Sequence, residues 1–184
     1  MPDLSNPAAT TCPIAPADAA GHTSGMNDHM TPEEHAARRA AITAELRAKT
    51  SIDEAMIERL VRAFYGKIQA DPLLGPVFAA RISDWEPHLE RMFAFWSSVT
   101  LLTGVYHGRP MQRHFGLPVE STHFDRWLTL FRQTAREICP PEAAAVFIGK
   151  AEMIAQSIEY GLATVAGIRL APGERFRNPA LAEG

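Results

Sequence analysis

Cysteine is scarce in this chain, with Cys12 and Cys139 the only two among 184 residues. They form neither a CxxC metal-binding pair nor a disulfide framework, a usage typical of a protein in a reducing cytoplasm. Charge of one sign is also scarce, because 18 basic and 21 acidic side chains leave a net charge of -3. Without a basic excess, the chain is not expected to bind nucleic acid or an anionic membrane surface.

Long hydrophobic runs are missing as well. No stretch approaches the roughly 18 apolar residues of a membrane span, and residues 1–30 lack the basic start and apolar core of a secretory signal. A cytoplasmic location is therefore expected. Alternating strand patterns and Asn-Gly hairpin signals are absent too, which predicts an all-α protein.

The chain divides into four parts by composition. Residues 1–30 have no aromatic side chain and are rich in small and polar residues, which predicts a disordered tail. Thr31, Pro32 and Glu34 have the spacing of a capping box and open a polar, peripheral helix over residues 31–50. A compact helical domain is expected over residues 51–166, and a second tail from Gly167 to residue 184.

Within the compact domain, mostly apolar residues recur at helical spacing in four stretches. They are Ile57, Val61, Phe64 and Ile68; His88, Met92, Phe95 and Val99; Phe124, Trp127, Phe131 and Ala135; and Phe147, Ala151, Ile154 and Ile158. Leu74 to Pro76 is expected to turn the chain. Glycines and prolines between Thr103 and Pro118 leave room only for a short helix of about two turns, which carries His114.

Polar side chains interrupt these apolar faces at Tyr65, His88 and Trp127. A plain structural role accounts for each one singly, as a core-edge tyrosine, a satisfied histidine and a core tryptophan. The imidazole of His114 is a good axial ligand for haem iron, and a short proline-bounded helix can hold it in place. Seven histidines are available, however, and spacing does not single out one of them.

Four groups of residues form an ordered set along the chain. They are Phe64-Tyr65 with Asp71–Phe78; Trp85–His88 with Phe95-Trp96; Gly108–His114; and Trp127–Phe131. In this order they resemble the group III truncated haemoglobins, small bacterial globins that hold haem in a reduced helical sandwich. The resemblance covers about residues 51–165 and implies a truncated globin fold, a two-over-two sandwich to which this chain adds an N-terminal helix.

The resemblance also implies a role for each site residue. His114 is similar to the proximal ligand of the iron in haem b, and Phe78 to the aromatic ring packed on the haem, where Met92 is placed too. Tyr65, His88 and Trp127 are similar to the distal pocket of the family. Helix geometry, in addition, predicts that Arg91, three residues past His88, reaches the haem edge to pair with a propionate, and that Arg113 does so from the other side.

Three functions follow as expectations. The first is binding of a diatomic gas, dioxygen or nitric oxide, with the Tyr65 hydroxyl and the Trp127 indole N–H as donors. The second is an enzyme that detoxifies nitric oxide or peroxide at the same iron and needs an external reductase. The third is a haem-free helical interaction protein, in which these side chains are core and rim.

Overall fold

The structure, a computed structural model, describes residues 30–182. The predicted disordered tail lies outside the described residues, except for Met30. The described part of the chain is helical and contains no strand, as predicted. Its helices are α1 (Pro32–Thr50), α2 (Glu54–Ala70), α3 (Gly75–Ala79), α4 (Trp85–Leu101), α5 (Pro110–His114), α6 (Ser121–Ile138), α7 (Pro141–Val165) and the short 3-10 helix η1 (Pro179–Leu181).

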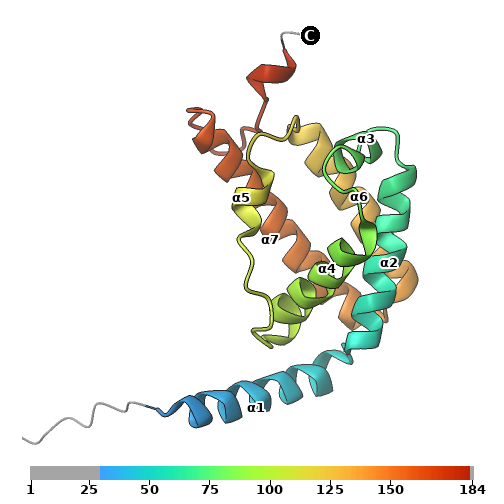
Figure 1. The fold of residues 1–184 in the computed structure, drawn as a ribbon, viewed down its shortest axis with the longest axis vertical. Coiled ribbons are helices and arrows are strands. Elements are labelled where there is room, and N and C mark those ends of the chain that lie inside the picture. Colours follow the sequence, from blue (N-terminus) through green and yellow to red (C-terminus); the bar gives the residue numbers. More distant parts are fainter. Residues whose placement is uncertain (1–29, 183–184) are drawn as a thin grey trace, which may run out of the picture. The chain divides into compact units, whose positions relative to one another are not determined.

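Two pairs of helices form the body of the fold. In Figure 1, α2 and α4 form one pair and α6 and α7 the other, with α2 packed against both α4 and α6. The core between them is aromatic, and the rings of Trp96 and Phe131 stack with centroids 4.8 Å apart. Phe147 of α7 meets Trp96 edge to face at 5.8 Å. The arrangement is the two-over-two sandwich that the sequence predicts.

The extra N-terminal helix is α1. Thr31 caps it, since its side chain accepts from the Glu34 N–H while the Glu34 carboxylate accepts from the Thr31 N–H. Most of α1 is exposed, but the hydroxyl of Thr43 donates to the carbonyl of Leu101, 2.8 Å away. This bond ties α1 to the last turn of α4.

The segment expected to be a turn at Leu74 to Pro76 instead begins the five-residue helix α3. The carboxylate of Asp71 accepts from the backbone N–H groups of Leu73 and Leu74 and also pairs with Arg126 of α6. Gly75 is required by close approach, because a Cβ atom there would lie 2.9 Å from the carbonyl oxygen of Gln69. Two local bonds of Asp71, the close approach at Gly75 and one remote ion pair with Arg126 therefore accompany a helix where local signals indicate only a turn.

The predicted C-terminal tail contains no α-helix up to residue 182, but its residues are not all solvated. Phe176 is 2% exposed and lies in a cluster with side chains of α6 and α7. Within residues 30–182, no helix combines the length and apolar character needed to cross a membrane.

Candidate functional site

His114 is the last residue of α5, a five-residue helix that begins at Pro110. Its Nδ1 atom donates to the carbonyl of Pro110, 2.8 Å away, so Nε2 keeps its lone pair. Burial lowers the pKa of His114, although the bond to Pro110 acts in the opposite direction. The side chain is therefore a neutral, oriented imidazole with one free nitrogen, which is the form that binds a metal.

The short helix α5 packs against α7. Met111 of α5 lies over Gly161, where a Cβ atom would be 2.4 Å from the sulfur of Met111. Around this contact lies a group of apolar residues that we call the second cluster. Its buried members are Val119, Phe124, Ala155, Ile158, Leu162, Ala163 and Phe176. Because α5 has no side-chain cap of its own, this packing is what places His114.

A group of four rings gathers where α2, α3 and α4 meet. Tyr65 faces His88 at a centroid distance of 5.0 Å and Phe78 at 5.9 Å. Trp85 stacks on Phe78 at 6.5 Å and meets His88 edge to face at 5.8 Å. The structure thus brings together three of the predicted site residues, Tyr65, Phe78 and His88.

The fourth ring of the group, Trp85, is one to which the sequence pattern assigns no role. It contacts all three of the predicted site residues in this group, including Tyr65 at 6.0 Å. The signal that identifies it is its position three residues before His88, which puts both side chains on one face of α4. We call these four residues, Tyr65, Phe78, Trp85 and His88, the ring group.

Trp127 of α6 joins the ring group indirectly. Its indole meets Phe64 at 5.3 Å, and Phe64 meets Tyr65 at 5.1 Å. On its other side Trp127 stacks on Phe131 at 5.2 Å with an interplanar angle of 10°. Two aromatic neighbours therefore restrict its rotation, while its indole N–H has no hydrogen-bond partner in the part of the chain that the structure describes.

One polar atom of the ring group is buried without a partner. Among residues 30–182, no hydrogen-bond partner reaches the buried Nε2 atom of His88. Burial, together with the charge of Arg91, lowers the pKa of His88 to about 4, and burial raises the pKa of Tyr65. Both side chains are neutral at pH 7. A buried polar atom without a partner is costly, so a ligand that pairs with His88 Nε2 is favoured.

The other residues predicted to contact haem are Arg91, Arg113 and Met92. Arg91 of α4 and Arg113 of α5 are exposed, and neither makes a hydrogen bond or ion pair within the described ranges. Met92 is half-buried and packs against the main core. The residues that recur at helical spacing on α4 are half-buried, since Met92, Phe95 and Val99 each keep part of their surface exposed. The neighbouring Trp96 is buried.

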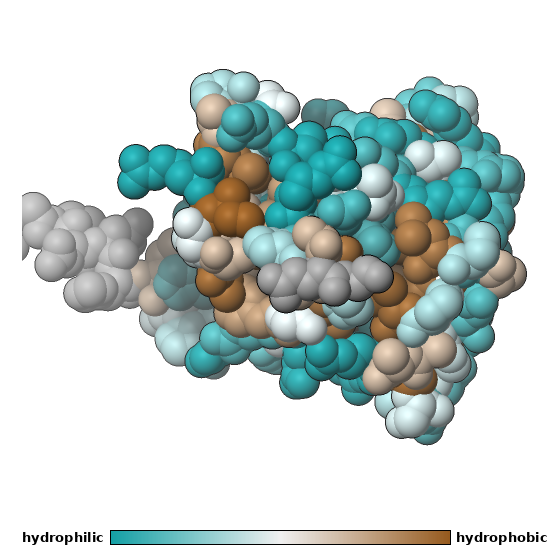
Figure 2. All heavy atoms as spheres, turned by 90° about the horizontal axis from the view of Figure 1, so that it is seen from above, coloured by the Kyte–Doolittle hydropathy of each residue, from teal (hydrophilic) through white to brown (hydrophobic). Residues whose placement is uncertain are grey.

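Apolar surface is exposed elsewhere on the molecule too. Figure 2 shows apolar residues reaching the surface in separate patches among hydrophilic ones. Phe115, which directly follows His114, is 37% exposed. Among the described residues, no group of three or more His, Cys, Asp or Glu side chains is placed to hold a metal ion. The features that the structure offers are an oriented neutral imidazole at His114, a buried unpaired nitrogen at His88 and exposed apolar surface at Phe115.

Comparison with known proteins identifies the same region. The family described as bacterial-like globin matches residues 52–157. The chain is 30% identical over 122 residues to the group 3 truncated hemoglobin ctb of Campylobacter jejuni, covering 64% of this chain and 96% of that protein. It is 24% identical over 109 residues to the group 2 truncated hemoglobin YjbI of Bacillus subtilis, covering 58% of this chain and 83% of that protein.

A solved structure shows the same likeness. The crystal structure of a group III truncated hemoglobin from Campylobacter jejuni matches with a TM-score of 0.56 and 32% sequence identity. The match covers 60% of this chain and 91% of that chain. The predicted fold class, with its two-over-two sandwich, is confirmed by this match together with the helices described above.

Proposed function

This chain belongs to the bacterial-like globin family as a truncated haemoglobin of the group III type, and we propose that it binds haem b with His114 as the iron ligand. A diatomic gas, dioxygen or nitric oxide, then lies beside Tyr65, His88 and Trp127. The observation that carries the proposal is the state of His114, whose Nδ1 atom is bonded to Pro110 while Nε2 keeps its lone pair.

The residues present fit a haem. A single imidazole is sufficient as the protein ligand because the porphyrin brings four nitrogen ligands of its own. Phe78 and Met92 supply half-buried apolar surface for the macrocycle. Arg91 and Arg113 are exposed cations with no carboxylate partner in the described ranges, as propionate binding requires. The unpaired Nε2 of His88 supports a ligand on the other side.

When bound, haem supplies a redox-active iron with an open position for a small ligand. The protein's own residues decide how long such a ligand stays. The Tyr65 hydroxyl and the Trp127 indole N–H are donors with no competing acceptor among residues 30–182. Tyr65 is buried and Trp127 is half-buried, so a hydrogen bond from Tyr65 to a ligand that carries partial negative charge is stronger than in water.

His88 acts on the same ligand in a different way. Its low pKa keeps the ring neutral, so one nitrogen carries a proton and the other does not. The ring is held between Tyr65 and Trp85, which meet it at the same interplanar angle of 85°. A ligand that enters the ring group is therefore within reach of the neutral imidazole of His88. If this ring lies in the ligand's path, the His88 side chain must move.

The proposal is tested by loading the protein with haem and recording its absorption. We expect a Soret band for the wild type and for His107→Ala, a matched control because His107 is an exposed histidine on the loop before α5. For His114→Ala we expect the loss of the wild-type ferrous spectrum. Wild-type protein without a Soret band, or an unchanged spectrum in His114→Ala, would contradict the proposal.

A catalytic role at the same site is tested by a separate measurement. Turnover of nitric oxide or peroxide needs electrons from an external reductase. Steady-state consumption with such a reductant would identify an enzyme, and a single stoichiometric reaction would identify a binding protein.

A further inference from the structure

The C-terminal segment, residues 168–182, lies beyond the region that the globin family matches, which ends at residue 157. It is nevertheless built into the fold. The backbone N–H of Phe176 donates to the carboxylate of Glu159 on α7, and its carbonyl accepts from the N–H of Ser121 on α6, each at 2.9 Å. The Phe176 ring is part of the second cluster, which also supports α5.

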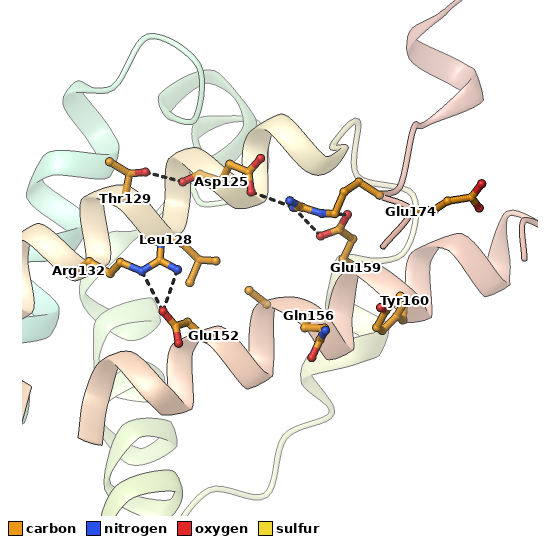
Figure 3. A pocket seen from close by; sticks show the side chains of 11 residues that line it. Asp125, Leu128, Thr129, Arg132, Glu152, Gln156, Glu159, Tyr160 and Glu174 are labelled. Carbon is orange, nitrogen blue, oxygen red and sulfur yellow. Dashed lines mark hydrogen bonds and ion pairs between the residues drawn. The ribbon is translucent and has the colours of Figure 1, made fainter. Parts of the chain in front are cut away.

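An ion-pair network anchors this segment. Its acidic members, Asp125 of α6 and Glu159 of α7, are labelled in Figure 3, and both pair with Arg175. Arg175 pairs with both oxygens of Glu159, at 2.8 and 2.9 Å, and with Asp125 at 2.8 Å. The Glu159 side chain is 7% exposed and that of Arg175 is 45% exposed, so the pair joins a buried carboxylate to a guanidinium at the surface. The segment is therefore held to both α6 and α7 directly before Asn178.

Asn178 connects the segment to the loop that follows His114. Its Nδ2 atom donates to the carbonyl of Leu117 at 3.3 Å and to the carbonyl of Val119 at 3.2 Å. Its Oδ1 atom accepts from the N–H of Ala180 at 3.1 Å, which caps η1. All the hydrogen-bonding groups of one amide are used, and both donors hold residues of the same loop.

The loop in turn holds the end of α5. The N–H of Leu117 donates to the carbonyl of His114 at 3.2 Å. Between them Gly116 has a φ of 71°, a left-handed conformation that glycine adopts without strain. On the other side, Arg81 donates to the carbonyl of Gly116 at 3.2 Å. A five-residue helix has little stability of its own, so these contacts fix its direction.

We propose that Asn178 is a positioning residue for His114, acting through the carbonyls of Leu117 and Val119. The C-terminal segment thereby sets the orientation of the proximal imidazole and the strength of its bond to the iron. This inference rests on the proposed haem function, because it assigns Asn178 a task at the same site.

The test is Asn178→Asp, which is almost isosteric. Its carboxylate still accepts from Ala180 and so keeps the cap of η1, but it has no donor for Leu117 or Val119. The matched control is Arg169→Ala, which removes an exposed side chain of the same segment that makes no hydrogen bond or ion pair among residues 30–182. A second variant, Asn178→Ala, removes the same donors without adding a charge.

Two readouts separate positioning from general stability. Amide hydrogen exchange of residues 115–120 reports the loop itself, and we expect it to be roughly 5- to 20-fold faster in both Asn178 variants, the effect of losing one or two hydrogen bonds. The iron–histidine stretching band in the resonance Raman spectrum of the reduced, haem-loaded protein reports the imidazole. We expect that band to shift or broaden in both variants and to be unchanged in Arg169→Ala.

Failure of this inference is distinguishable from failure of the proposed function. If haem binds normally and the stretching band of Asn178→Asp matches that of the wild type, the positioning role is wrong while the haem function stands. If the protein binds no haem, both proposals fail. Unchanged hydrogen exchange in residues 115–120 would overturn the role of Asn178 independently of any cofactor.

Discussion

The two histidines of the candidate site are both neutral for the same reason, since burial is the largest cause of the lowered pKa in each. Their partners differ. His114 has one nitrogen bonded to a backbone carbonyl, and His88 has a buried nitrogen with no partner among residues 30–182. The first is thereby oriented as a ligand, while the second is left available to whatever enters the ring group.

At the scale of single residues, the proposed hydrogen-bond donors of Tyr65 and Trp127 lead to a prediction. Tyr65→Phe and Trp127→Phe should each accelerate dioxygen dissociation by roughly 5- to 12-fold, because each removes a hydrogen bond worth about 1 to 1.5 kcal/mol. Stopped-flow dissociation measures the effect. Tyr160→Phe, which removes the hydroxyl of a tyrosine that is 43% exposed on α7, is the control and should leave the rate unchanged. Wild-type rates in both site variants would remove these donors from ligand retention.

At the scale of elements, α4 depends on a helix from outside the globin core. The carbonyl of Leu101, a residue with no exposed surface, lies in the last turn of α4, where a helix leaves its carbonyls unpaired. Thr43 of α1 supplies the missing donor. The N-terminal helix thus stabilises the end of the helix that carries His88.

This contact predicts that Thr43→Val destabilises the protein, although the two side chains have the same shape. The buried carbonyl of Leu101 loses its partner, which costs about 1 to 2 kcal/mol, or roughly 2 to 8 °C in Tm. Thermal unfolding followed by circular dichroism measures the change. Thr164→Val serves as the control, because that exposed hydroxyl bonds only within α7, to Tyr160. Equal Tm values for the two variants would show that α1 does not support α4.

For the whole molecule, the shifted pKa values together set the pH range of stability. His88 has a pKa of about 4 instead of 6.5, so the unfolded chain binds its proton first as the pH falls below 6.5. Burial of Asp71 opposes its ionisation, but hydrogen bonds from Leu74 and Arg126 outweigh burial and lower its pKa. Both groups make stability fall toward acid, since the unfolded state takes up more protons there.

Two groups act in the opposite direction at high pH. Burial raises the pKa of Cys139 from 9.0 to about 11 and also raises that of Tyr65. The unfolded chain therefore loses these protons first, and stability falls as the pH rises above 9.0.

These signs predict a plateau of Tm between pH 6.5 and 9.0. His88→Gln should make the acid side less steep between about pH 4 and 6.5, where the lowered pKa of His114 still contributes a slope, and Cys139→Ala should flatten the start of the alkaline side. One proton contributes a slope of at most about 1.4 kcal/mol per pH unit. Measurement of Tm against pH for the wild type, His88→Gln and Cys139→Ala checks this prediction. Identical profiles would mean that the pKa of neither group changes on folding.

The sequence determined by itself what depends on neighbours along the chain. Proline and capping residues delimit α1 and α2, and α5 was expected close to where the structure has it, because a helix end is a local event. The ordered motifs were sufficient for the family and the fold class, both of which are confirmed. The roles of His114, Tyr65, His88 and Trp127 remain predictions.

Only the tertiary structure decided what depends on contacts between distant residues. It paired Asp71, which precedes the helix α3, with Arg126 of α6, and it placed Trp85 against Tyr65. It also folded part of the C-terminal segment onto the domain, where Asn178 reaches Leu117 across 61 positions of sequence. Such pairs have no periodic or local signature, since they form only after the helices have packed and brought distant side chains within reach.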